Sequence, residues 1–197
     1  MKPVVLASKS ASRGAILRGA GVAFESLDAG VDEGAAKAEL LAKGAGPREV
    51  AEKLAELKAL AVSAKRPGLV IGADQTLDLD GALYDKADSL DDARDRLQTL
   101  RGRAHHLHSA VALAEAGEIV WRTTATPRLT MRRFSDAFLD GYLARGGADL
   151  LGSVGCYLLE GEGAQLFERI EGDYFAILGL PLVPLLEELR LKGALAS

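Results

Sequence analysis

The chain has 197 residues, of which 48% are hydrophobic and 26% charged, so we expect one globular domain over residues 1–197 with a substantial core. Its formal net charge is -4 with both signs interspersed, which argues against a nucleic-acid duplex as a partner. The single cysteine, Cys156, excludes an internal disulfide, and no apolar run is long enough for a signal peptide or a membrane span, so we expect a cytoplasmic protein that does not bind membranes.

The first predicted unit is a strand, a hydroxyl-rich loop and a helix. Residues 4–7 form a short apolar run, residues 8–13 are rich in serine, and apolar residues from Ile16 onward recur at helical spacing. Unpaired N–H groups and the dipole at a helix N-terminus attract anions, so the serines and Arg13 suit a phosphate cradle. An N-cap from Ser10 or Ser12 with a solvated Arg13 explains the pattern equally well.

An acidic loop follows a second predicted strand over residues 22–27. Asp32 and Glu33 end this loop, just before an alanine-rich helix that extends to about Gly44. Acidic residues in a first helical turn favour the helix dipole, which is a sufficient structural reason for both. A metal ligand is the alternative interpretation.

Pro47 is typical of a helix start, and the next helix has one apolar face. Val50, Leu54 and Leu57 belong to that face. By this pattern Lys58 lies on the surface.

An apolar run ending in a carboxylate comes next. Residues 69–71 are consecutive and bulky, which is typical of a strand covered on both faces, and Gly72 and Ala73 then mark its expected end. Asp74 is thereby predicted at the mouth of a buried sheet, where open α/β folds place chemistry. The alternative is an aspartate that only caps a turn.

A hairpin is predicted where Asp80-Gly81 separates two alternating segments. It returns the chain toward Asp74 and brings Lys86 with it. Ser89 then caps a helix with an apolar face.

The next region, from about residue 104 to 132, is predicted as two strands, residues 107–113 and 119–131. It contains all three histidines of the chain. His106 and His108 fall on one strand face at a spacing that a metal could use, but half-exposed strand histidines are the favoured interpretation, since no cysteine is near.

The last quarter begins with a helix from Ser135 and ends with a helix after Pro181. Between them, residues 152–164 contain several glycines and two glutamates. Glycines let the backbone of a loop come close to another group, and the edge of a bound ligand is one candidate for that group.

Several segments together resemble the Maf family of nucleotide pyrophosphatases, in order and spacing over essentially the whole chain. They are LASKSASR, the pair Asp32-Glu33, residues 54–59, GADQT, YDKA and EGDYFAILGLPL. The resemblance implies a two-lobed α/β fold around an elongated mixed sheet with flanking helices, of the Maf and inosine-triphosphatase type. The nucleotide is expected in a cleft between the lobes, and the family often forms homodimers.

The resemblance also implies roles for single residues. Asp74 matches the general base of the family, and the polar cleft set is matched by Ser8, Arg13, Glu33, Lys58 and Lys86. The implied reaction hydrolyses a nucleoside triphosphate between its α and β phosphates, which needs cations to neutralise the phosphates. A divalent cation, Mg²⁺ or Mn²⁺, is the implied cofactor, with Glu33 beside Asp74 as its expected ligand.

Two positions suggest a preference for the base. Gln75 and Glu160 resemble the family branch that acts on 7-methyl-GTP, whereas the branch acting on thymidine and uridine triphosphates has Thr and Gln there. A glutamate accepts hydrogen bonds from the N–H edge of guanine. Ser12, Gly14 and Ala87 depart from the usual family residues, and Ser12 stands at a position where the branches differ.

We therefore expect a metal-dependent nucleoside triphosphate pyrophosphatase acting on modified nucleotides. The alternatives are a pyrophosphatase that prefers dTTP or UTP, a phosphohydrolase that releases orthophosphate, and a nucleotide-binding regulator of septum formation with little turnover.

Overall fold

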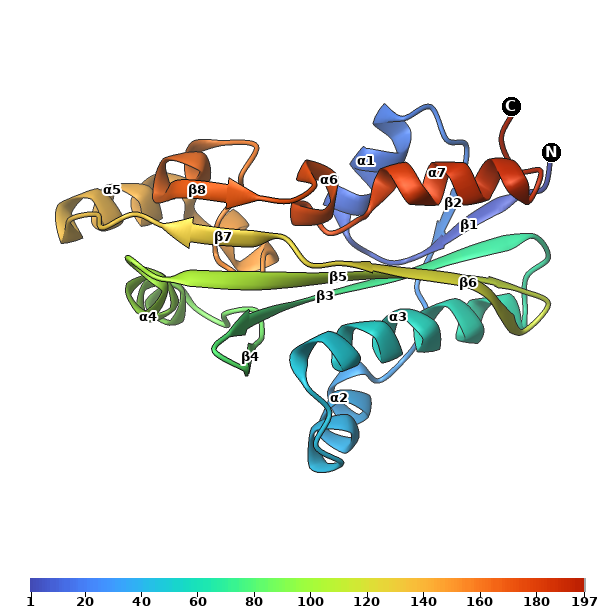
Figure 1. Cartoon of the computed structure of the whole chain (residues 1–197), viewed down its shortest axis with the longest axis horizontal. Coiled ribbons are helices and arrows are strands. Elements are labelled where there is room, and N and C mark those ends of the chain that lie inside the picture. Colours follow the sequence, from blue (N-terminus) through green and yellow to red (C-terminus); the bar gives the residue numbers. More distant parts are fainter. Residues whose placement is uncertain (197) are drawn as a thin grey trace.

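The computed structural model describes residues 1–196, which form a mixed α/β fold around one eight-stranded sheet (Figure 1). The expected α/β class with an elongated mixed sheet and flanking helices is confirmed. The elements in chain order are β1 Val4–Ala7, α1 Ala11–Gly19, β2 Glu25–Leu27, α2 Glu33–Ala42, α3 Pro47–Ser63, β3 Leu69–Leu79, β4 Ala82–Tyr84, α4 Leu90–Leu100, β5 Ala104–Glu115, β6 Glu118–Ala125, β7 Arg128–Met131, α5 Asp136–Gly146, the 3-10 helices η1 Gly147–Gly152 and η2 Glu162–Leu166, β8 Phe167–Glu171, α6 Tyr174–Ile177 and α7 Leu182–Leu191.

Two long antiparallel strands, β3 and β5, form the spine of the sheet. The strand order is β2-β1-β3-β5-β7-β8, with β4 paired to β3 and β6 paired to β5. Strand β5 occupies one edge of β3 from Val70 to Asp78. The other edge of β3 is shared by β1, which pairs as far as Gly72, and by β4, which begins to pair at Leu77. Residues 73–76 therefore face an open stretch between two neighbouring strands.

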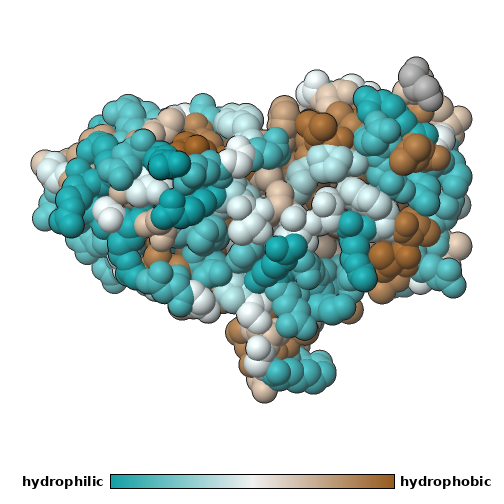
Figure 2. All heavy atoms as spheres, viewed as in Figure 1, coloured by the Kyte–Doolittle hydropathy of each residue, from teal (hydrophilic) through white to brown (hydrophobic). Residues whose placement is uncertain are grey.

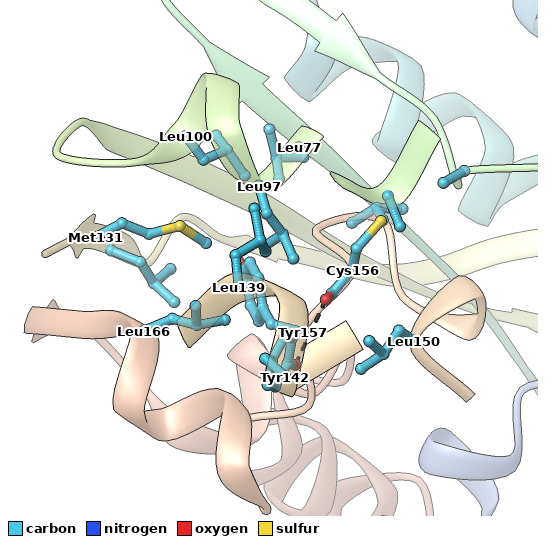
Figure 3. Close-up of a cluster of buried hydrophobic side chains, with 14 of the residues drawn as sticks. Leu77, Leu97, Leu100, Met131, Leu139, Tyr142, Leu150, Cys156, Tyr157 and Leu166 are labelled. Carbon is cyan, nitrogen blue, oxygen red and sulfur yellow. Dashed lines mark hydrogen bonds between the residues drawn. The ribbon is translucent and has the colours of Figure 1, made fainter. Parts of the chain in front are cut away.

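Separate hydrophobic cores lie on either side of this open stretch. One packs α1 and α7 on β1 and the first half of β3, through residues such as Leu17, Ile71 and Leu185. The other packs α4, α5 and the C-terminal 3-10 helices on the second half of β3 (Figure 3). Figure 3 shows Leu77, Leu97 and Leu139 meeting in this second core, where the Tyr142 hydroxyl donates a hydrogen bond to the carbonyl of Cys156. The two cores give the fold its two lobes.

Helix α3 covers the opposite face of the sheet, as Figure 1 shows. Its alanines pack on a row of alanines of β5, from Ala110 to Ala114. Small side chains on both elements let the helix axis come close to the sheet, and a long apolar helix face is the reason that Pro47 to Ser63 forms a helix here. Hydrophilic residues cover much of the surface seen in Figure 2, and α2 projects from its lower edge. Within residues 1–196, no helix is both long and apolar enough to cross a membrane.

Most of the predicted helix starts are confirmed by their caps. Ser10, Ser89 and Ser135 each accept a hydrogen bond from a backbone N–H of the following turn, and Asp32 does the same for α2. The hairpin between β3 and β4 is also confirmed, because Asp80 and Gly81 both have positive φ, as a tight turn of this kind requires.

Three strand predictions are wrong. Strand β3 does not stop at Gly72 but continues to Leu79, so Asp74 is inside a strand and not at its end. Strand β2 begins only at Glu25, and the segment predicted from residue 119 to 131 is two strands, β6 and β7. The break lies at Pro127, which has no N–H for a ladder hydrogen bond.

The prediction of half-exposed histidines is wrong for two of the three. His105 is fully buried and shares a 2.8 Å hydrogen bond with the Tyr157 hydroxyl. His108 is buried too, between Thr126 Oγ1 and Asp78 Oδ2, each 3.1 Å away. His106 and His108 do share a face, with rings stacked 6.5 Å apart, but no group of three or more potential metal-ligating His, Cys, Asp or Glu side chains occurs in residues 1–196.

The burial of His105 gives a pH-dependent stability. Burial, helped by the nearby charge of His106, lowers the pKa of His105 from its ordinary 6.5 to about 4. The unfolded chain therefore takes up this proton first, so the stabilisation is complete above pH 6.5 and is lost as the pH falls toward 4. We expect this lowered pKa to reduce the free energy of unfolding by about 2 kcal/mol when the pH falls from 7.5 to 5. Urea unfolding at both values should give a shallower pH dependence for His105→Gln; an equally steep one would contradict the assignment.

Candidate active site

A cleft of about 740 Å³ lies at the open stretch of β3, between the two lobes. Strand β1 ends at Ala7 and delivers Ser8 to one side of it, and β4 ends at Tyr84 and delivers Lys86 to the other. Every site residue that the sequence predicted lines this cleft: Ser8, Ser12, Arg13, Glu33, Lys58, Asp74, Gln75, Lys86 and Glu160. These residues come from segments far apart in the chain, and the fold gathers them in one place.

The centre of the cleft contains a lysine between two carboxylates. Lys58 Nζ lies 2.7 Å from Asp74 Oδ1 and 2.8 Å from Glu33 Oε2. Asp74 and Lys58 are 8% and 5% exposed, whereas Glu33 at the start of α2 is exposed. The helical pattern that placed Lys58 on the surface is therefore wrong, since Lys58 belongs to the buried face of α3 and its charge is neutralised there by the two carboxylates.

Gly72 allows this close approach of α3 to β3. A Cβ atom at this position would clash with the carbonyl oxygen of Ala55 and lie 2.6 Å from the backbone nitrogen of Ala59. The glycine thus sets the distance between the helix that carries Lys58 and the strand that carries Asp74. Gly72 was predicted to end the strand, but it acts through packing in the middle of the strand.

The oxygen atoms of Asp74 and Glu33 suit a hard divalent cation. One oxygen of each carboxylate lies within ion-pair distance of Lys58 Nζ. Within residues 1–196, no other donor forms a hydrogen bond to Asp74. Mg²⁺ is commonly held by only one or two protein carboxylates together with substrate phosphates and water. The donor set present is therefore sufficient for such an ion with a phosphate ligand, although the two carboxylates alone do not form a closed metal site.

The N-terminus of α1 forms another wall of the cleft. Ser10 caps the helix through the Arg13 backbone N–H, and the Arg13 side chain donates to Gly179 O at 2.9 Å and to Ser8 Oγ at 3.2 Å. Arg13 is half-buried, so the solvated arginine of the alternative interpretation is wrong. Burial lowers the pKa of Arg13 from its usual value of 12.5, while the charges of Asp74 and Glu33 oppose this shift. A fixed guanidinium beside free N–H groups is suited to an anion.

Gln75 occupies the wall on the other face of β3. Its Nε2 donates to Ser109 Oγ at 2.8 Å and to the carbonyl oxygens of Ala176 and Ile177 at 3.1 and 3.0 Å. These hydrogen bonds hold α6 against the spine of the sheet. Gln75 therefore shapes the cleft through α6, and its amide NH₂ is already engaged.

The glycine-rich segment forms the remaining wall, through residues 152–154 and 157–160, of which Glu160 is exposed. Its glycines serve close packing within the segment itself. A Cβ at Gly163 would lie 2.8 Å from the backbone nitrogen of Leu158, and one at Gly155 would clash with the Tyr157 ring. The predicted close approach exists, but the partner is the protein itself.

Several further polar residues at the cleft were given no role by the sequence, and three of them, Lys37, Asp85 and Arg96, make contacts that shape it. Lys37 of α2 and Asp85 after β4 both line the cleft and form an ion pair with one another. Arg96 of α4 donates to Asp85 O and to Val154 O, each at 2.6 Å, and so ties two cleft walls together. Lys37 could have been identified from the sequence, because it lies four residues after Glu33 and hence on the same helix face. Arg96 could not, because both of its acceptors are backbone carbonyls, which no sequence pattern marks.

Comparisons with known proteins cover almost the whole chain. The family model described as "Maf-like protein" matches residues 3–192. A nucleoside triphosphate pyrophosphatase of Caulobacter vibrioides is 63% identical over 195 residues, which cover 99% of this chain and 98% of the relative. A nucleoside triphosphate pyrophosphatase of Granulibacter bethesdensis is 53% identical over 193 residues, with 98% of both chains covered. A 7-methyl-GTP pyrophosphatase of Rhizobium meliloti is 50% identical over 197 residues, with 99% of both chains covered.

Proposed function

This chain belongs to the family of Maf-like proteins, and from that premise we propose that it is a nucleoside triphosphate pyrophosphatase. The reaction is hydrolysis of the bond between the α and β phosphates, giving a nucleoside monophosphate and pyrophosphate. The observation that carries the proposal is the Asp74–Lys58–Glu33 arrangement, which lies in the same cleft as the anion-suited N-terminus of α1.

We assign the general base to Asp74. Its side chain is buried at the open stretch of β3, and Lys58 holds one of its oxygens at 2.7 Å. The second oxygen is thereby oriented and can accept a proton from a water molecule that attacks the α phosphate. Rigid placement on the central strand keeps this oxygen in position, which a loop aspartate does less well.

The cations of the cleft are assigned to the phosphates. Attack of water on an anionic phosphate requires neutralisation of the charge that develops in the transition state. Arg13 and Ser8 bind phosphate oxygens beside α1, Lys86 approaches from the β4 side, and Lys58 adds positive charge at the centre. The positive charge of Lys58 also offsets the repulsion between the carboxylates of Asp74 and Glu33.

A divalent cation, Mg²⁺ or Mn²⁺, is part of this proposal, with Asp74 and Glu33 as its protein ligands. When bound, it would polarise the attacking water and neutralise phosphate oxygens. Glu33 fits this role because it is the first residue of α2, at an exposed position that leaves room for phosphate and water ligands.

The experiment that tests the proposal is pyrophosphate release from a panel of nucleoside triphosphates, including 7-methyl-GTP, UTP and dTTP, with Mg²⁺ or Mn²⁺. We expect turnover of at least one nucleotide, with pyrophosphate as the product. Binding of nucleotide without turnover would instead support a nucleotide-binding regulator, and release of orthophosphate would support a different phosphohydrolase.

We further propose that the preferred base resembles 7-methylguanine. Glu160 supports this, since it lies on the exposed rim of the cleft and a carboxylate accepts from a guanine N–H edge. Two kinds of relative are named among those compared, a general nucleoside triphosphate pyrophosphatase and a 7-methyl-GTP pyrophosphatase. Gln75 contributes by holding α6 in place and not through its NH₂ group.

The preference should move when Glu160 loses its charge. For Glu160→Gln we expect the ratio of kcat/KM for 7-methyl-GTP to kcat/KM for UTP to fall about tenfold, because one charge-assisted hydrogen bond to the base is weakened. Adding Gln75→Thr should lower the ratio further. Glu162→Gln is the matched control, since Glu162 is on the same segment but pairs with Arg145 at 2.8 Å. An unchanged ratio in Glu160→Gln would contradict the assignment.

A further inference from the structure

Helix α2 packs beside α3 and is also tied to the cleft by two of its side chains. None of its residues is buried, and in Figure 1 it stands below α3, away from the sheet. An alanine-rich helix of this length has little stability of its own, so its contacts decide where it lies. Two of its side chains reach the cleft, Glu33 and Lys37, and each forms an ion pair there.

The two ion pairs join α2 to different walls. Glu33 pairs with Lys58 at the centre, and Lys37 pairs with Asp85, the residue before Lys86. The Lys37 side chain is only 22% exposed, whereas Asp85 is 58% exposed. Lys37 is therefore enclosed by the cleft, while its present partner is largely in solvent.

The pairing of Lys37 with an exposed carboxylate is weak enough to be exchanged. Ion pairs with solvent-exposed partners contribute little to stability, because water and salt screen them. A phosphate group carries more charge and more acceptor oxygens than one carboxylate, so it competes well for the same ammonium group. Lys37 and Lys86 would then face the ligand together from the side opposite α1.

We propose that Lys37 is a substrate-binding residue for the pyrophosphate end of the triphosphate, and that it leaves Asp85 to contact the β and γ phosphates. This inference rests on the proposed function. Those two phosphates hold most of the negative charge of a nucleoside triphosphate, and they depart as one product. An ammonium group that can exchange one anionic partner for another suits a group that must be released, whereas the fixed Arg13 suits the part that is held during the reaction.

The test compares the two products as ligands. In Lys37→Met, titration calorimetry with magnesium pyrophosphate should show about tenfold weaker binding, while binding of the nucleoside monophosphate stays unchanged. KM for the triphosphate should rise by a similar factor with little change in kcat, and Lys37→Arg should restore most of the loss. Asp85→Asn should bind pyrophosphate at least as tightly as the wild type, since it removes the competing carboxylate.

Lys43→Met is the matched control. Lys43 follows the same helix but pairs with Glu39 in solvent, outside the cleft, so its replacement should change neither affinity. Unchanged pyrophosphate binding in Lys37→Met, an equal loss for both products, or weaker pyrophosphate binding in Asp85→Asn would each overturn the proposal. Calorimetry needs no turnover, so a wild type that binds pyrophosphate through Lys37 but hydrolyses no nucleotide would refute the proposed function while still showing that Lys37 binds pyrophosphate.

Discussion

Replacing Asp74 with asparagine is expected to lower kcat for pyrophosphate release by at least about 100-fold, which is the usual contribution of a general base. The amide has nearly the same shape, so the strand should still form, and the side-chain oxygen can still accept from Lys58 at 2.7 Å. What is lost is the second anionic oxygen and its ability to take a proton. Initial rates at saturating nucleotide and metal measure this effect directly.

The control for Asp74 is another aspartate of the same cleft. Asp88 is exposed, lines the cleft and is not bonded to Lys58, so Asp88→Asn removes one negative charge without touching the central arrangement. Its kcat should stay within a few-fold of the wild type. Equal rates for Asp74→Asn and the wild type, with nucleotide still bound, would remove Asp74 from the role of base.

Replacing Gly72 with alanine is expected to destabilise the protein by about 3 kcal/mol, at the upper end of what an inserted methyl group costs in a packed interior. The clashing atoms belong to the backbone of α3 and cannot rotate away, so the helix must shift as a whole. Because α3 carries Lys58, the shift should also move Nζ away from Asp74 and lower kcat. Chemical unfolding and steady-state rates on the same sample measure both effects.

Gly19→Ala is the matched glycine variant. Gly19 ends α1, and a Cβ there would meet no atom within 4 Å, so its unfolding free energy should change by less than about 0.5 kcal/mol. If Gly72→Ala were as stable as Gly19→Ala and equally active, the packing of α3 on β3 would not set the geometry of the site.

The elements of this fold were largely predictable because their signals are local. Caps such as Ser89, the Asp80-Gly81 turn and the start at Pro47 each depend on a few neighbouring residues. The length of β3 was not predictable in this way. Gly72 and Ala73 resemble the end of a strand, but pairing with β5 on one edge carries the strand through them to Leu79.

The candidate site was predictable in membership but not in arrangement. Resemblance to a family named residues that all line one cleft, whereas the local pattern placed Lys58 on the surface. The predicted apolar face included Leu57, which is 40% exposed, whereas Lys58 lies one turn after the buried Leu54 and reaches two carboxylates. The missing information was the open stretch between β1 and β4, which arises only when three strands pair.

The buried histidines illustrate the same limit. Alternation along β5 put His106 and His108 on one face correctly, but it could not reveal that Asp78 and Thr126 satisfy both ring nitrogens of His108. Partners on a neighbouring strand and in the β6–β7 connection decide whether this polar strand residue can be buried. The sequence alone does not specify those partners.

The most direct measurement of the central claim is the product balance of a single reaction. Wild-type protein with Mg²⁺ or Mn²⁺ and a nucleoside triphosphate that it turns over should form pyrophosphate and nucleoside monophosphate in equal amounts, with no orthophosphate. Formation of orthophosphate and nucleoside diphosphate would place the cleavage at the terminal phosphate and contradict the proposed function.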